Sequence, residues 1–229
     1  SFEWADDGTF YTLVGDEART RVVRCDADEA DWERTFEAQG ADRAVVGLSI
    51  GGDTAAMGLS HPSEGHDPYA LPVDDLSADE EPDSLTRLAN VNDDLTGEYE
   101  MPEVRRMTFE NDGWEISGVL YHPPDYEPGE SDPAPTVCAI HGGPVPYDEP
   151  VFSFAHSVLT SRGYLVFRPN YRGGSSFGRQ FCETLHGRWG TVEASDIAAG
   201  VEDLVDRGWT DPDRVFGYGF SYGGIAQGY

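Results

Sequence analysis

The sequence has 229 residues, of which 38% are hydrophobic and 12% aromatic, enough to build a hydrophobic core and to argue against wholesale disorder. Its 43 acidic residues outnumber its 15 basic residues, which gives a formal net charge of −28. So negative a surface repels phosphate backbones and argues against a nucleic-acid partner. No stretch approaches the roughly 18 apolar residues of a membrane-spanning helix, and no secretory signal pattern opens the chain, so we expect no membrane partner.

The basic residues are all arginine, because the sequence contains no lysine. One explanation is simply an acidic protein. The explanation that we favour is a halophilic protein adapted to molar salt. In such salt, short surface carboxylates hold hydrated cations, and a Debye length of about 3 Å screens their mutual repulsion.

Three cysteines, Cys25, Cys138 and Cys182, lie far apart in the sequence, and there is no C-x-x-C pair. An odd number of cysteines without a disulfide framework indicates a reducing setting, so we expect a cytoplasmic protein. Cys138 lies inside an apolar run, where we expect it to be a buried small hydrophobic residue.

Residues 1–100 contain short apolar runs between turns rich in glycine and aspartate, a pattern that predicts antiparallel strands. The clearest runs are 9–14, 20–25, 44–50 and 54–60. We expect a last strand within 84–95, a solvated acidic loop at 74–84, and a domain boundary within 96–102.

A weak repeat lies within this region. Asp7-Gly8-Thr9 and Gly52-Asp53-Thr54 hold equivalent places, 45 residues apart when counted from Thr9 to Thr54. A period near this length, with about four strands in each unit, is typical of β-propeller blades. The alternative is an unrelated small β-sheet, since two blades cannot close a ring.

Residues 101–229 have a different pattern. Alternating apolar and polar residues at 104–109 and 114–121, joined by Asn111-Asp112-Gly113, predict a hairpin. Buried strands are then expected at 136–140, 164–167 and 215–218, with helices at 152–159 and 192–207. Strands that alternate with helices predict a mostly parallel, doubly wound α/β sheet.

The helix expected at 192–207 has the clearest signals. An apolar face is predicted from Ile197, Val201, Leu204 and Val205. Thr191 is the expected N-terminal cap, and Gly208 is expected to end the helix.

The strand at 215–218 runs into Gly219-Phe220-Ser221-Tyr222-Gly223, a G-x-S-x-G motif. In such a motif a strand turns sharply into a helix and exposes a strained serine at the apex, so Ser221 is the candidate nucleophile. The flanking glycines are expected because strand and helix cross too closely for side chains.

Two further glycine-bearing loops, His141–Pro144 and Arg172–Ser175, follow the buried strands 136–140 and 164–167. Ligands of open α/β sheets bind beyond the carboxyl ends of the strands, where these loops would meet Ser221. A tetrahedral intermediate on Ser221 needs donors for its oxyanion, and we expect the backbone N–H groups of Tyr222 and Gly143 to supply them.

A serine nucleophile needs a base that an acid orients, and this fold places both after the serine. The chain stops eight residues after Ser221 (229 minus 221), and neither a carboxylate nor a histidine follows it. We therefore expect the acid and the histidine in a longer polypeptide. The six histidines all precede Ser221 and lack metal-ligand spacing: His61, His66, His122, His141, His156 and His186. We expect neither a metal nor another cofactor.

The motifs of the second half together resemble the prolyl oligopeptidase family of serine peptidases, in particular its acylaminoacyl-peptidase and dipeptidyl-aminopeptidase-like branch. The resemblance covers about residues 102–229. It rests on 141–144, 170–175, Trp189-Gly190, Asp196-Ile197, 211–214 and 219–224.

This resemblance implies an α/β-hydrolase domain, here truncated, preceded by the last blades of a β-propeller, with domains at 1–100 and 101–229. It implies a serine peptidase with Ser221 as nucleophile, Gly143 and Tyr222 as the oxyanion hole, and short or N-acylated peptides as substrates. The missing acid and histidine imply little activity for this segment alone. Whether the protein forms homo-oligomers is left open.

Two other functions compete with the peptidase. A carboxylesterase or lipase uses the same serine turn, although a preceding propeller argues against it. A truncated interaction protein that has lost its catalytic partners is the third hypothesis, and it involves no catalysis.

The salt hypothesis predicts that the protein loses secondary structure on dialysis from molar salt into dilute buffer, because unscreened carboxylates then repel one another. Far-ultraviolet circular dichroism measures this loss. An unchanged spectrum in dilute buffer would refute the hypothesis.

Overall fold

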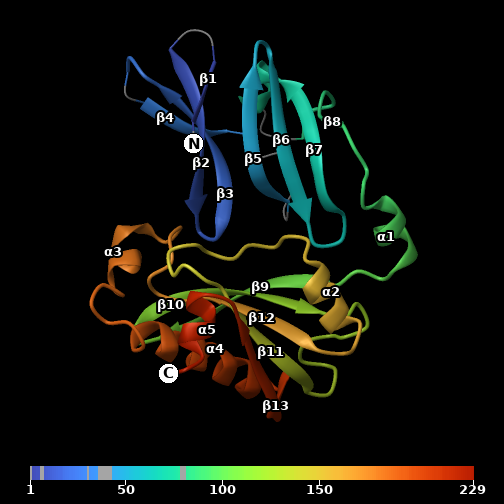
Figure 1. The fold of residues 1–229 in the computed structure, drawn as a ribbon, viewed down its shortest axis with the longest axis vertical. Coiled ribbons are helices and arrows are strands. Elements are labelled where there is room, and N and C mark those ends of the chain that lie inside the picture. Colours follow the sequence, from blue (N-terminus) through green and yellow to red (C-terminus); the bar gives the residue numbers. More distant parts are fainter. Residues whose placement is uncertain (1, 6–7, 30, 36–42, 78–80) are drawn as a thin grey trace. The chain divides into compact units, whose positions relative to one another are not determined.

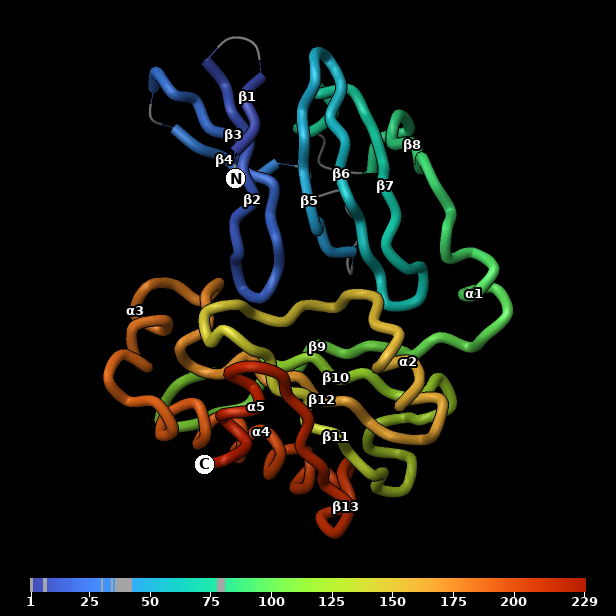
Figure 2. Tube along the Cα trace, in the orientation of Figure 1, coloured from blue at the N-terminus to red at the C-terminus, as the bar shows by residue number. Residues whose placement is uncertain are grey.

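The computed structural model describes residues 2–5, 8–29, 31–35, 43–77 and 81–229 (Figure 1). The chain forms two compact units. One comprises Ser1–Tyr99 with Pro150–Phe152, and the other comprises Glu100–Glu149 with Ser153–Tyr229. The trace in Figure 2 shows β-sheet in both. None of the described helices is long and apolar enough to cross a membrane.

The first unit contains two four-stranded antiparallel sheets, each with its strands in chain order. The first sheet consists of β1 (Phe2–Trp4), β2 (Thr9–Asp16), β3 (Arg19–Asp26) and β4 (Asp31–Thr35). The second consists of β5 (Ala44–Gly51), β6 (Thr54–His61), β7 (Gly65–Pro72) and β8 (Thr86–Arg87). The second strand of each sheet begins at an equivalent position, Thr9 in the first sheet and Thr54 in the second. One period of the repeat seen in the sequence therefore corresponds to one four-stranded sheet. Asp7 of that repeat lies outside the described residues.

The structure differs from the sequence-based prediction at several places in this unit. β1, β4 and β7 were not predicted, and β7 contains Pro68 and Pro72. The prolines are tolerated because β7 is close to an edge strand, since β8 beside it has only two residues. The strand predicted at 84–95 is wrong for most of its length, because only β8 is extended there and α1 (Asp93–Glu98) begins within that range. The loop expected at 74–84 contains most of the 3₁₀ helix η1 (Val73–Ser77), whose Leu76 is buried.

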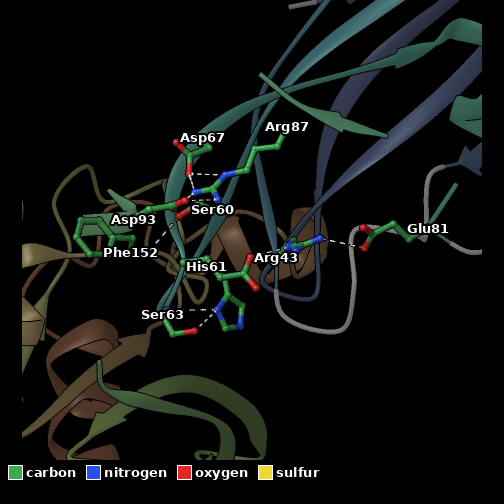
Figure 3. Close-up of polar contacts among 10 residues, drawn as sticks. Arg43, Ser60, His61, Ser63, Asp67, Glu81, Arg87, Asp93 and Phe152 are labelled. Atoms are coloured by element: carbon green, nitrogen blue, oxygen red, sulfur yellow. Dashed lines mark hydrogen bonds and ion pairs between the residues drawn. The ribbon is translucent and has the colours of Figure 1, made fainter. Parts of the chain in front are cut away.

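Polar contacts tie the ends of the second sheet together (Figure 3). Arg87 pairs with Asp67 of β7 and with Asp93 at the start of α1, so it fixes the segment that leaves the sheet. Phe152 returns to this unit, where its N–H donates to the Ser60 hydroxyl at 3.0 Å and its ring meets His66 edge-on.

The second unit is built on one mixed five-stranded sheet with the order β13-β11-β12-β10-β9. Its strands are β9 (Glu103–Asn111), β10 (Trp114–His122), β11 (Ala134–Ile140), β12 (Leu165–Asn170) and β13 (Thr210–Gly219). β11 is parallel to both β12 and β13, whereas β10 is antiparallel to both β9 and β12. The expected parallel arrangement is therefore confined to β11, β12 and β13.

Helices cover both faces of this sheet. The helices are α2 (Phe154–Thr160), α3 (Gly178–Glu183), α4 (Val192–Asp206) and α5 (Tyr222–Ala226). Leu159 of α2 packs with Val119 and Val166 on one face, whereas Leu204 of α4 packs with Phe167 on the other. Cys138 is buried in the latter cluster, as its apolar neighbours predict, and burial raises the pKa of its thiol to about 12.

The buried face of α4 includes three of the predicted residues, because Ile197, Val201 and Leu204 pack on the core cluster of this unit. Leu204 is fully buried, but the face also contains the carboxylates of Glu193 and Asp196, which are both 0% exposed. Thr191 occupies the N-cap position as predicted, but its hydroxyl accepts no N–H from the helix and instead donates to the Arg188 carbonyl oxygen. Backbone N–H groups before the helix donate to Glu193.

Gly200 provides a test of how tightly α4 packs on the sheet. A Cβ atom at Gly200 would lie 2.7 Å from Phe167 and 2.8 Å from Phe109. We expect Gly200→Ala to lower the free energy of unfolding by about 1–3 kcal/mol, because overpacking outweighs the better helix propensity of alanine. Denaturant titration measures this value.

Gly97 of α1 is the matched control, because a Cβ atom there would meet nothing within 4 Å. Gly97→Ala should be neutral or stabilise by up to about 1 kcal/mol. If both variants gain stability equally, the close packing of α4 is refuted.

Candidate active site

The turn between β13 and α5 holds Ser221 in a conformation rare for a residue with a side chain, with φ 55° and ψ −123°. Such conformations cost about 1–3 kcal/mol and persist only where the surroundings impose them. Close packing imposes this one. A Cβ atom at Gly223 would lie 2.0 Å from the Ile140 carbonyl oxygen, and one at Gly219 would lie 2.5 Å from the Gly223 carbonyl group. Ser221 itself is exposed to solvent.

The loop after β11 lies directly beside this turn. A Cβ atom at Gly142 would be 3.1 Å from the Phe220 carbonyl oxygen, 3.5 Å from the Ser221 Cβ atom and 3.9 Å from the Tyr222 nitrogen. Gly143 follows with φ 126°, a conformation that favours glycine. Within the described ranges, no acceptor takes the N–H of Gly143 or that of Tyr222. Both groups are therefore available to a ligand.

The loop after β12 is tied to the loop after β11. The Tyr171 hydroxyl donates to the His141 carbonyl oxygen at 2.8 Å, and the two rings stack with centroids 4.2 Å apart. Further along, the Ser175 N–H donates to the Val145 carbonyl oxygen at 2.6 Å. The three glycine-bearing loops are thus brought together, as expected from the carboxyl ends of parallel strands.

A buried ion pair fixes the start of the loop after β12. The Arg172 guanidinium, 3% exposed, donates to both Asp196 carboxylate oxygens at 2.6–3.0 Å. Asp196 also accepts from the Arg172 backbone N–H at 2.8 Å and from Asn111 at 2.7 Å. The bond to Asp196 raises the pKa of Arg172, with Asp112 adding to the effect. The Arg172 backbone can therefore move little relative to α4.

A second buried carboxylate reaches the serine turn. Glu193 accepts from the Tyr222 hydroxyl at 2.5 Å and from the Gly190 N–H at 2.5 Å. Sequence reasoning did not single out Glu193 as a site residue, and it used Asp196 only as part of a motif. The signal was present, because both lie one helical turn apart on the face that also holds Leu204.

The candidate triad is incomplete in the described part of the chain, where no hydrogen bond joins the Ser221 hydroxyl to a histidine or a carboxylate. His141 lies on the loop beside Ser221, and within the described part of the chain its buried Nε2 has no hydrogen-bond partner. Its Nδ1 lies 3.0 Å from the Gly142 carbonyl oxygen and 3.1 Å from the Tyr171 hydroxyl. Burial lowers the pKa of His141, so its ring is neutral at neutral pH. No cluster of potential metal ligands occurs among the described residues.

The two carboxylates that pair with Arg172 allow a matched comparison. We expect Asp196→Asn to lower the free energy of unfolding by about 3–5 kcal/mol, because it removes the buried counter-ion of a buried guanidinium. Asp112→Asn should cost less than about 1 kcal/mol, because the Asp112 side chain is 62% exposed. Chemical denaturation of both variants measures the difference. Equal costs would show that Asp196 does not hold the loop.

Comparison with known proteins places this geometry in a family. Residues 150–229 match the model described as the prolyl oligopeptidase family. Dipeptidyl aminopeptidase BIII of Pseudoxanthomonas mexicana is 36% identical over 99 residues, which are 43% of this chain and 14% of that protein.

Solved structures match over nearly the whole chain. The acylaminoacyl peptidase of Pyrococcus horikoshii has a TM-score of 0.80 at 18% identity, and the match covers 99% of this chain and 34% of that one. The Mycobacterium tuberculosis puromycin-hydrolyzing peptidase has a TM-score of 0.74 at 24% identity, and the match covers 98% of this chain and 34% of that one. At these identities the matches show the fold alone. The chain spans about a third of these solved chains and 14% of the dipeptidyl aminopeptidase.

The resemblance predicted from the motifs is therefore confirmed: residues 150–229 match the prolyl oligopeptidase family, and the chain is similar to acylaminoacyl and dipeptidyl peptidases.

Proposed function

We propose that the complete protein is a serine peptidase that hydrolyses short or N-acylated peptides through an acyl-enzyme on Ser221. The observation that carries the proposal is the strained, exposed position of Ser221 between β13 and α5, with Gly142 packed against it. The names of the related proteins, which include dipeptidyl and acylaminoacyl peptidases, support a peptide substrate.

The Ser221 hydroxyl oxygen attacks the acyl carbon of the substrate, and its proton passes to a general base. The carbonyl oxygen becomes an oxyanion, which needs donors already in place. The N–H groups of Gly143 and Tyr222 are suited to this role because Tyr222 follows Ser221 and Gly143 follows Gly142, which packs against Ser221. Neither N–H has an acceptor in the described ranges. The base then protonates the leaving amine, and water hydrolyses the acyl-enzyme.

The histidine base and the acid that orients it are proposed to lie outside this sequence. None of the six histidines contacts the Ser221 hydroxyl in the part of the chain that the structure describes. Loss of triad partners costs several orders of magnitude in rate, so this segment alone should hydrolyse little.

We also propose that residues 1–100 form the last blades of a β-propeller that limits substrate size. Aligning Thr9 with Thr54 pairs the second strands residue by residue: Phe10, Thr12 and Val14 correspond to Ala55, Met57 and Leu59. The second set is buried in a cluster that includes Tyr11 of the first sheet. The first set lines an open apolar hollow beside Trp32, which is 64% exposed. The face that is buried in the second sheet is therefore open in the first sheet. A preceding blade stacked on the first sheet would cover that open face.

We propose that residues 101–229 form the N-terminal part of an α/β-hydrolase domain. The parallel strands β11, β12 and β13, with helices on both faces, support this assignment. A cytoplasmic location and adaptation to salt stay predictions from composition.

Substitution of Ser221 in the complete native polypeptide tests the function. We expect Ser221→Ala to abolish labelling by a fluorophosphonate probe and to lower peptidyl-nitroanilide hydrolysis by at least about 10⁴-fold, because the nucleophile is lost. Ser161→Ala is the control, since Ser161 is an exposed serine at the end of α2 and should leave both readouts unchanged.

Two outcomes would contradict the proposal. Turnover of p-nitrophenyl esters without turnover of peptidyl nitroanilides would favour a carboxylesterase. Absence of probe labelling in the unmodified complete protein would favour a non-catalytic interaction protein.

A further inference from the structure

Glu193 is a charged side chain without contact with solvent. It lies in the first turn of α4 and is 0% exposed. A buried carboxylate is costly unless hydrogen bonds compensate it. Three donors do so here: the Tyr222 hydroxyl at 2.5 Å, the Gly190 N–H at 2.5 Å and the Thr191 N–H at 3.2 Å. The phenol of Tyr222 is the side-chain donor of this set.

Tyr222 connects this carboxylate to the reacting serine. Its side chain is 3% exposed, and its ring meets Trp189 edge-on at 5.2 Å. Burial raises the pKa of Tyr222, and the bond to Glu193 raises it further, so the phenol stays protonated and keeps donating. Its backbone N–H directly follows Ser221, where Gly142 packs.

The serine turn has to be held from two sides because Ser221 is strained. The contact of Gly223 with the Ile140 carbonyl oxygen holds one side. On the other side, the bond between Glu193 and Tyr222 joins the first residue of α5 to the first turn of α4. Loss of this bond would let the Tyr222 peptide rotate, because no backbone acceptor in the described ranges fixes its N–H.

We infer that Glu193 is a positioning residue that, through the Tyr222 phenol, fixes the Tyr222 N–H as an oxyanion donor. This inference rests on the proposed peptidase function. The alternative is a purely structural role, in which Glu193 only accepts hydrogen bonds from the N–H groups of Gly190 and Thr191 and so fixes the start of α4.

Tyr222→Phe separates the two roles, because it removes the phenol and leaves the backbone bonds of Glu193 intact. In the complete native polypeptide we expect kcat to fall about tenfold or more with KM unchanged, below the roughly 10²–10³-fold loss of a whole oxyanion donor. Affinity for a peptide boronic acid, whose tetrahedral adduct occupies the oxyanion site, should fall by a similar factor.

Two further variants sharpen the test. Glu193→Gln should retain most of the kcat, because the amide oxygen still accepts from Tyr222 and Gly190, whereas Glu193→Ala should lose at least as much as Tyr222→Phe. Tyr126→Phe is the matched control. It removes another buried phenol bond of the same unit, from Tyr126 to the Trp209 carbonyl oxygen at 2.8 Å, and should leave kcat unchanged.

Hydrogen exchange of the peptide spanning residues 219–226 provides a readout that does not depend on activity. We expect faster exchange in Tyr222→Phe and Glu193→Ala than in Tyr126→Phe. If Ser221→Ala shows that the proposed function is wrong, this exchange alone decides whether Glu193 positions the turn. An unchanged kcat in Tyr222→Phe, or exchange no faster than in Tyr126→Phe, would overturn the inference.

Discussion

The close approach of α5 to the end of β11 is the constraint on which the rest of the site depends. Only glycine fits at position 223, because a Cβ atom there would overlap the Ile140 carbonyl oxygen at 2.0 Å. With α5 so near the sheet, the chain from β13 has to turn within two residues, and Ser221 takes a positive φ. The exposed serine is thus a consequence of backbone packing, and its strain of about 1–3 kcal/mol has to be offset by the surrounding contacts.

One helix supplies much of that compensation. Within its first two turns, α4 carries Glu193, which bonds to Tyr222 of the serine turn, and Asp196, which bonds to Arg172 of the loop after β12. The helix is itself pressed on the sheet where Gly200 meets Phe109 and Phe167. Buried ion pairs add little net stability compared with apolar packing, but their fixed geometry restricts where the joined backbones can go. The conformations of the serine turn and of the loop after β12 therefore depend on the position of α4.

Sequence reasoning located the serine turn and most strands, because glycine spacing and apolar runs are local signals. Ser221, Gly142 and Gly223 meet in the structure because parallel strands end at one edge. Glu193 could not be predicted as a site residue, because hydrophobic periodicity places a carboxylate on the exposed face of a helix. Its partner, Tyr222, lies 29 positions away, and no local pattern reports such a pairing. Strand β7 was missed because its prolines argue against a strand unless the short neighbour β8 is already known.

The buried and exposed carboxylates of this chain respond to salt in different ways. The 43 acidic residues outnumber the 15 basic ones and give a net charge of −28. The repulsion between exposed carboxylates depends on ionic strength, because salt screens it. Glu193 and Asp196 are both 0% exposed and bound by donors at fixed positions, so their interactions are screened much less. Dilute buffer should therefore act on the chain through its surface charge, whereas the bonds that order the loops around Ser221 keep their strength as long as α4 stays on the sheet.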